Sequence, residues 1–340
     1  MDVNVTLATW SNLLIYSAMA VYAIAFLLYS NDLFGGRKLA AEQQTTAARR
    51  SAAKAGRPVR TSRSSVAVLD RDDDDASEET GPVREAAAPG RRTSARMATS
   101  LTVLAAALHV AAVLTRAISV MRVPWGNMME YALTASALAM LVYIIVLYFS
   151  DIRYLGTFVS GGVLITLGLC ITVFYTPAAQ LVPALQSYWI WIHVPIAILS
   201  TALLSVSAIL ALFQILKART EKKDLTTGLW SMFARVPASE VVEQLSYRIA
   251  AVGFITWTFT VIAGAIWAEV AWGRPWGWDS KEIWSFVVWV VYAAYLHSRA
   301  TRGWSATQVA VLNILGFGTL LFNFAIVNVY FDGLHAYSGL

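Results

Sequence analysis

The chain has 340 residues, of which 57% are hydrophobic and only 14% are charged, with a formal net charge of +5. This composition is too apolar for a soluble domain of that length, so it predicts an integral membrane protein. The sequence contains neither a Walker A motif nor a Gly-x-Gly-x-x-Gly loop, which excludes the common nucleotide-binding classes. No nucleic acid is expected as a partner.

Eight apolar windows recur along the chain, each long enough to cross a hydrocarbon layer of ~30 Å as a helix. In chain order they are 10–30, 98–118, 131–149, 154–174, 189–216, 247–270, 283–299 and 307–331. The fold class expected is therefore all-α: a polytopic membrane helix bundle of about eight transmembrane helices.

Lysine and arginine collect in alternate connections between these windows. The basic connections carry Arg37, Lys38, Arg49, Arg50, Lys54, Arg57, Arg60 and Arg63, then Lys217, Arg219, Lys222, Lys223, Arg235 and Arg248, and finally Arg299 and Arg302. The opposite connections carry only Arg122, Arg274 and Lys281. Basic connections face the cytoplasm, so both termini and the connection 272–284 are predicted to face outward from the plasma membrane.

Residues 36–97 differ in composition from the rest of the chain. They are rich in Ala, Ser, Thr, Arg and Pro, with a basic first half followed by the acidic run Asp70–Glu79. Such a stretch buries too little apolar area to offset its chain entropy. We expect a first transmembrane helix within 1–35, a disordered cytoplasmic linker over 36–97, and a transmembrane domain over 98–340.

The connection 272–284 reads Trp-Gly-Arg-Pro-Trp-Gly-Trp-Asp-Ser-Lys-Glu-Ile-Trp. Its four tryptophans, Trp272, Trp276, Trp278 and Trp284, offer large flat apolar faces suited to a flat apolar ligand. The alternative is an interfacial aromatic belt that anchors the helix ends. A belt does not require the Trp-Asp-x-Lys-Glu string, so a ligand site is favoured. Asp279 is predicted mainly to organise this loop, with an acid–base role as the second possibility.

Two of the four histidines are predicted to lie beside this loop. His193 is at the outward start of the fifth window and His335 follows the last window. Two imidazoles on separate helices that flank an aromatic loop suit the two axial positions of a planar tetrapyrrole. Taken singly, each is better explained as an interfacial histidine hydrogen-bonded to lipid headgroups; the combination with the loop favours ligation.

The other two histidines are predicted to lie at different depths. His297 lies 14 residues after Ile283, roughly 21 Å deeper at 1.5 Å per residue, so it cannot share an iron with His193 or His335. Its iron, if it binds one, needs a second ligand from another protein; the alternative is a polar residue at the inner interface. His109 falls near mid-membrane and is predicted to be buried and structural. Cys170 is the only cysteine, which excludes an internal disulfide and a Cys-x-x-Cys pair.

These residues resemble the CcsA/ResC family, the multispanning subunit of the system II cytochrome c synthase, within the haem-handling proteins that share a tryptophan-rich "WWD" signature. The resemblance rests on Trp272-Gly-x-x-Trp276-Gly-Trp278-Asp279-x-Lys281-Glu282, on His193 before it, and on His297 and His335 after it. It covers about residues 100–335. The string Arg116…Pro124…Asn127…Glu130 also resembles the family's early outer loop, where Glu130 is predicted to pair with Arg116 or Arg122.

The resemblance implies that the chain delivers haem across the membrane and attaches it to the Cys-x-x-Cys-His segment of an apocytochrome c, as a haem lyase. It implies non-covalent haem b with ferrous iron, a CcsB/ResB-type membrane partner and thiol-reducing factors. His193 and His335 are the implied external haem ligands, and His297 the transmembrane ligand, matched by a histidine of the partner. Lys281 and Glu282 are candidates to meet haem propionates or partner residues.

The candidate site is assembled from these residues. Its catalytic residues are His193, His335 and Asp279; its haem-binding residues are His193, His335, His297, Trp272, Trp276, Trp278 and Trp284; and its iron ligands are His193, His335 and His297. Three alternatives remain open at the level of the sequence: a haem exporter or carrier without ligation activity, a permease for an aromatic metabolite, and a scaffold that docks a partner's external domain.

Overall fold

The computed structural model describes residues 3–34, 89–181, 183–225, 230, 232–233 and 236–335. Within these ranges the regular structure is helical throughout, as the apolar windows predicted. Residues 36–88 of the expected linker lie outside the described residues.

Eight long helices make up the bundle. They are α1 (Val5–Phe34), α3 (Pro89–Val120), α4 (Met128–Phe149), α5 (Gly156–Thr172), α6 (His193–Lys223), α7 (Ser239–Trp272), α8 (Ser280–Ala300) and α9 (Ala306–Leu321). The shorter elements are η1 (Arg153–Leu155), η2 (Pro183–Leu185), η3 (Tyr188–Trp191), the π-helical turn η5 (Phe322–Val327) and α10 (Asn328–Tyr330).

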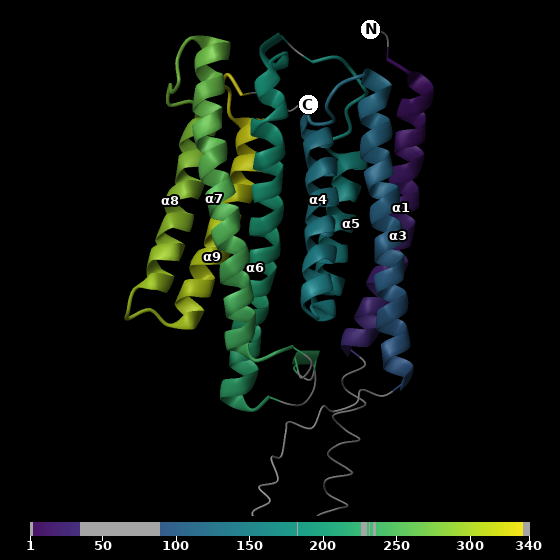
Figure 1. The fold of residues 1–340 in the computed structure, drawn as a ribbon, viewed down its shortest axis with the longest axis vertical. Helices are drawn as coiled ribbons and strands as arrows, with labels where there is room; N and C mark the ends of the chain where they lie inside the picture. Colours follow the sequence, from purple (N-terminus) through teal and green to yellow (C-terminus); the bar gives the residue numbers. More distant parts are fainter. Residues whose placement is uncertain are drawn as a thin grey trace, which may run out of the picture.

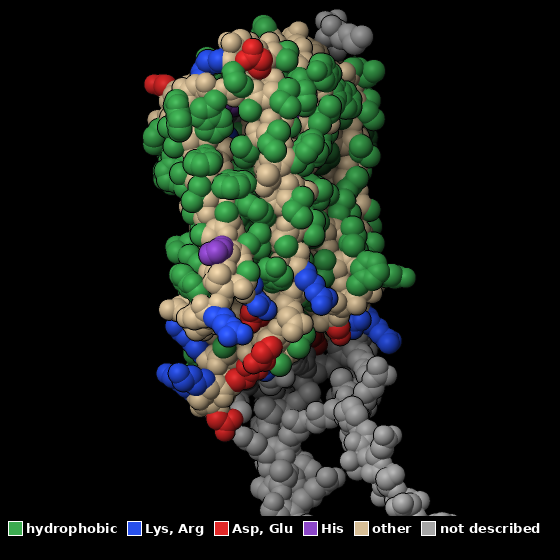
Figure 2. All heavy atoms as spheres, turned by 60° about the vertical axis from the view of Figure 1, so that its left-hand side comes forward, with side chains coloured by type: hydrophobic (Ala, Val, Ile, Leu, Met, Phe, Trp, Pro, Cys, Tyr) green, Lys and Arg blue, Asp and Glu red, His purple; other side chains and the backbone are tan. Residues whose placement is uncertain are grey.

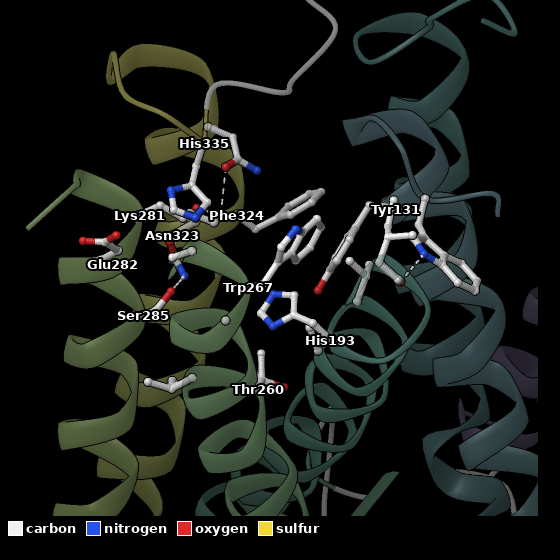
Figure 3. Close-up of a pocket in the computed structure, with 18 of the residues that line it drawn as sticks. Tyr131, His193, Thr260, Trp267, Lys281, Glu282, Ser285, Asn323, Phe324 and His335 are labelled. Atoms are coloured by element: carbon white, nitrogen blue, oxygen red, sulfur yellow. Dashed lines mark hydrogen bonds between the residues drawn. The ribbon is translucent and has the colours of Figure 1, made fainter. Parts of the chain in front are cut away.

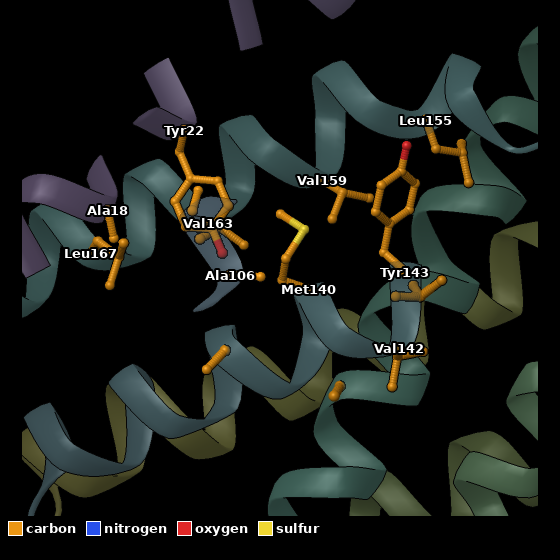
Figure 4. Packing of buried hydrophobic residues seen from close by; sticks show 14 of the residues in the cluster. Ala18, Tyr22, Ala106, Met140, Val142, Tyr143, Leu155, Val159, Val163 and Leu167 are labelled. Carbon is orange, nitrogen blue, oxygen red and sulfur yellow. The ribbon is translucent and has the colours of Figure 1, made fainter. Parts of the chain in front are cut away.

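Successive long helices run antiparallel and form two neighbouring groups (Figure 1). One group comprises α1, α3, α4 and α5, with Tyr22, Met140 and Val163 among its fully or nearly fully buried side chains (Figure 4). The other comprises α7, α8 and α9, and α6 packs against both groups. One end of the bundle, called here the cavity end, therefore carries the connections 121–127, 173–192 and 273–279 and residues 331–335.

The described surface is that of a multi-pass membrane protein. Hydrophobic side chains cover the long middle of the face in Figure 2, and charged side chains gather towards its two ends. Seven of the described helices are long and apolar enough to cross a membrane. The eighth long helix, α8, has the length of a span but is not among these seven, and it carries Lys281, Glu282, His297 and Arg299 near its ends.

Helix ends extend beyond several of the predicted windows. The helix α3 begins at Pro89, so residues 89–97, expected as linker, are helical. The helix α7 begins at Ser239 and continues without a break to Trp272. Hydrogen bonding along a helix continues into polar flanking residues, whereas a hydropathy window ends where the apolar residues end.

The two ends of the described chain lie at the same end of the bundle. The backbone N–H of Asn4 donates to the carbonyl of Ser119 (2.8 Å), which ties the start of the chain to the end of α3. His335 follows α10 at this same cavity end. Which side of the membrane this end faces remains a prediction from the basic connections.

Candidate functional site

A cavity of about 230 Å³ opens between α4, α6, α7, α8 and α9 at the cavity end. His193 and His335, separated by more than 140 residues in sequence, both line it (Figure 3). Its walls are largely aromatic and aliphatic, from Trp125, Tyr131, Leu185, Ile190, Val194, Trp257, Val261, Trp267, Trp272, Trp276, Leu320 and Phe324. A mostly apolar pocket with a few converging polar groups is the usual form of a ligand site.

His335 is held by the tryptophan-rich loop. Its Nδ1 lies 3.1 Å from Oδ1 of Asp279, whose Oδ2 accepts from the backbone N–H of Leu334 (2.8 Å). The Trp272 ring meets the imidazole edge-on with centroids 4.7 Å apart. A carboxylate on one ring nitrogen fixes the orientation of an imidazole, leaving Nε2 for a ligand. Burial lowers the pKa of His335 despite the neighbouring Asp279, which keeps the imidazole neutral.

His193 is the first residue of α6 and lies against α7. Its ring meets Trp267 edge-on with centroids 5.6 Å apart. A Cβ at Gly264 would lie 2.9 Å from Cε1 of His193, so this glycine makes room for the imidazole. Nδ1 of His193 is buried and has no hydrogen-bond partner among the described residues. Because this nitrogen is in a cavity wall, it is available to a ligand.

The four tryptophans of the loop do not act as one surface. Trp272 and Trp276 line the cavity. Trp278 is 70% exposed and has a left-handed backbone (φ 61°), and it meets Trp276 edge-on. Trp284 packs against Phe322 of η5 with centroids 4.2 Å apart and rings tilted by 38°, and it does not line the cavity. Only half of the predicted aromatic set therefore faces the cavity.

Asp279 has two structural tasks at the start of α8. It caps the helix by accepting from the backbone N–H of Lys281 (2.8 Å), and its other contacts hold His335 and Leu334. Glu282 completes the capping box, accepting from the backbone N–H groups of Asp279 (3.0 Å) and Gly277 (2.8 Å). Burial opposes ionisation of Asp279, but these hydrogen bonds and His335 outweigh burial and lower its pKa. Asp279 thus organises the loop and orients a histidine.

A buried ion cluster supports the opposite wall of the cavity. The fully buried carboxylate of Glu130 accepts hydrogen bonds from Nε of Arg116 (3.3 Å), Nη1 of Arg122 (2.7 Å) and the backbone N–H of Gly126 (2.9 Å). Both arginines pair with it, where the sequence left open which would. The cluster fixes the connection 121–127, whose Trp125 lines the cavity.

A polar patch in the cavity was missed at the level of the sequence. Asn323 in the π-helical turn η5 and Asn328 at the start of α10 line the cavity together with Ser285 of α8. Nδ2 of Asn323 donates to Oγ of Ser285 (3.3 Å). Two asparagines at the end of an apolar window were the available signal, because intramembrane polar groups are usually functional.

The remaining histidines lie away from the cavity. His297 is exposed on the surface of α8, near the opposite end of that helix, and does not line the cavity. His109 is fully buried, with Nε2 3.0 Å from the carbonyl of Leu133 and Tyr22 against its ring. This is the buried, hydrogen-bonded position expected of a structural histidine, although its aromatic neighbour was not foreseen.

The fold and this site define a class: a multi-pass helical membrane protein with two histidines and an aromatic loop around one cavity. The chain belongs to the cytochrome c assembly protein family, whose model matches residues 101–335. The family resemblance noted from the sequence is confirmed.

Individual relatives agree with this assignment. The chain is 36% identical over 192 residues to the cytochrome c biogenesis protein CcsA of Thermosynechococcus vestitus, covering 47% of this chain and 60% of that protein. It is 39% identical over 175 residues to CcsA of Guillardia theta, covering 48% and 58%. The matches thus span about three fifths of the length of these relatives. The fold is also similar to that of the cytochrome c haem lyase CcmF (TM-score 0.58, 16% identity), covering 95% of this chain and 47% of that one.

Proposed function

We propose that this protein binds haem at the cavity end and attaches it to an apocytochrome c, as a CcsA-type subunit of a system II cytochrome c synthase. The observation that carries the proposal is that His193, in the middle of the family-matched region, and His335, at its end, line one cavity walled by Trp272 and Trp276. The names of the relatives, cytochrome c biogenesis protein and cytochrome c haem lyase, agree with this function.

Haem is the substrate, and the cavity residues fit it. Two neutral imidazoles suit the two axial positions of a ferrous iron. Two nitrogens are available to the iron. One is Nδ1 of His193, which has no hydrogen-bond partner within the described part of the chain, and the other is Nε2 of His335, because Nδ1 of that ring contacts Asp279. The flat aromatic walls suit the macrocycle.

The chemistry is addition of two thiols to two vinyl groups. In each addition the cysteine sulfur bonds to the vinyl carbon attached to the ring, the thiol proton goes to the terminal carbon, and no electrons are gained or lost. The histidine of the Cys-x-x-Cys-His segment replaces one protein imidazole on the iron. The protein contributes mainly position, since holding the vinyl groups beside the thiols makes the reaction effectively intramolecular.

The wider assembly completes the proposal. His297, exposed on the surface of α8, is proposed to hold haem earlier on its route, together with a histidine of a CcsB/ResB-type partner. Thiol-reducing factors keep the client cysteines reduced. The positive-inside rule places the cavity end on the extracytoplasmic side of the plasma membrane.

Co-expression with a tagged apocytochrome c and the membrane partner tests this function. Covalent haem on the client after denaturing electrophoresis is the expected result, and it should be lost when His193 and His335 are both changed to glycine. Bound haem without covalent product would instead support a haem exporter or carrier. A preparation without a Soret band would support a permease, and tryptophan variants that lose only the partner complex would support a scaffold.

A further inference from the structure

Lys281 is a cation that enters the cavity without a carboxylate partner. It is in the first turn of α8, and its Nζ donates to the carbonyl of Asn323 (2.8 Å) and to Oδ1 of Asn328 (2.8 Å). Both acceptors are neutral. An ammonium has three donors, so one donor remains without an acceptor in the described part of the chain. Among the described residues, no acidic side chain forms an ion pair with it.

The two nearest acids in sequence are engaged elsewhere. The Asp279 carboxylate accepts from the backbone of Lys281 and of Leu334 and contacts His335. The Glu282 carboxylate accepts from two backbone N–H groups of the loop. Glu282 also lines the cavity, but its carboxylate is held by these loop N–H groups and lies 3.9 Å from Nη1 of Arg274. Lys281 has no such ion pair among the described residues.

An unpaired cation in an apolar cavity is costly unless an anion joins it. Withdrawing a charge from water without a partner costs several kcal/mol in real proteins. The hydrogen bonds to Asn323 and Asn328 hold the ammonium in place. Because Oδ1 of Asn328 accepts from Nζ, the Nδ2 group of the same amide is a second donor beside Nζ. Two donors side by side match the two oxygens of a carboxylate.

We propose that Lys281 and Asn328 form a carboxylate-binding subsite of the cavity, and that its ligand is a propionate of the tetrapyrrole. This inference rests on the proposed haem function and adds the orientation of the ligand. Lys281 on α8 and Tyr131 on α4 lie on opposite sides of the cavity (Figure 3). A propionate at Lys281 directs the vinyl-bearing part of the ring towards α4 and Trp125, where the client thiols must reach it.

The test compares iron protoporphyrin IX with its dimethyl ester, which keeps the ring, the iron and the vinyl groups but has no carboxylate. Each is titrated into the purified full-length chain and followed by its Soret band. The wild-type protein is expected to bind the free acid about 10- to 100-fold more tightly than the ester, the range of a hydrogen bond to a charged group. Lys281→Met is expected to abolish this preference while leaving ester affinity unchanged.

The outcomes separate this inference from the proposed function. Equal affinity of the wild-type protein for acid and ester overturns the subsite but leaves haem binding intact, whereas binding of neither ligand overturns the proposed function itself. If Lys281→Met binds both ligands more weakly by the same factor, the lysine only supports α9, and the inference fails. Lys281→Gln repeats the comparison should the methionine variant not fold. Lys217→Met, on α6 far from the cavity, is the matched control and should keep the preference.

Discussion

The position of His193 depends on a glycine in the neighbouring helix, which has no side chain to fill the space of the imidazole. Gly264 on α7 lies where a Cβ would come within 2.9 Å of the His193 imidazole, so the ring occupies space that any other residue would fill. Ordinary carbon contacts are longer than 3.4 Å. A glycine in the middle of a long helix otherwise weakens that helix, and here the close approach of the histidine explains it.

Gly264→Ala is therefore expected to move the imidazole and to lower haem affinity about tenfold or more, because a ligand displaced by even 1 Å loses much of its effect. Its α-helical content should stay the same or rise slightly. Haem titration with circular dichroism measures both. Gly168→Ala, where a Cβ meets nothing within 4 Å, is the control; equal haem affinities of the two variants would contradict the positioning role.

Asp279 orients the second histidine, and its charge strengthens that imidazole as a ligand. Asp279→Asn keeps the size of the side chain but removes the charge from the contact with His335 (3.1 Å). Loss of such a partner weakens metal affinity about 10- to 100-fold. A haem titration of this variant measures the loss, with Asp151→Asn, on an exposed ion pair, as control. An unchanged affinity would show that the carboxylate only caps α8.

The same pair predicts a pH dependence. Burial holds the pKa of His335 below its ordinary value of 6.5, so the neutral imidazole predominates at pH 6.5, and haem affinity should fall under more acidic conditions. Asp279 raises the pKa of His335 and so opposes the effect of burial. Asp279→Asn should therefore move the loss of haem affinity to still lower pH. Titrations across acidic pH measure the midpoint; a shift of the midpoint to higher pH in the variant would contradict the assignment.

At the scale of elements, the wall opposite α8 depends on a buried charge. Glu130 at the start of α4 neutralises Arg116 and Arg122 and so holds the connection that carries Trp125. Glu130→Ala leaves two guanidinium groups without their carboxylate, which is expected to cost about 3–5 kcal/mol. Thermal unfolding in detergent measures this loss.

An exposed pair provides the contrast. Asp151→Ala removes the partner of Arg153 on a solvent-exposed connection, and its effect is expected to stay within about 0.5 kcal/mol. If Glu130→Ala unfolds at the same temperature as Asp151→Ala, the buried cluster is not what stabilises this connection.

The number and order of the helices were predictable because the length of each apolar segment can be read from the sequence, and each predicted window corresponds to a helix. Their polar ends were not, since residues 89–97 and 239–246 are helical by continuing hydrogen bonds rather than by hydropathy. The roles within the loop were also hidden. Whether Trp276 lines the cavity while Trp284 packs against Phe322 depends on local backbone angles, such as the left-handed one at Trp278, that residue identity does not reveal.

At the scale of the whole molecule, topology creates the site. His193 lies at the start of the fifth window and His335 follows the last. They reach the same end of the bundle because an even number of antiparallel long helices, α6 to α9, lies between them. The sequence could predict this shared end from alternating basic connections. It indicated Lys281 as a candidate contact for a propionate. It could not predict that the π-helical turn after α9 would add polar groups to the same cavity, because π-helical hydrogen bonding has no simple sequence pattern.

The central claim is that His193 and His335 hold one haem iron in this cavity. Absorption spectra of the purified chain loaded with haem, as wild type, His193→Gly, His335→Gly and His297→Gly, test it most directly. The wild type and His297→Gly should share a six-coordinate, low-spin spectrum, and each of the other two variants should lose it and regain it on addition of imidazole. A low-spin spectrum that persists when His193 and His335 are both glycine would contradict the account.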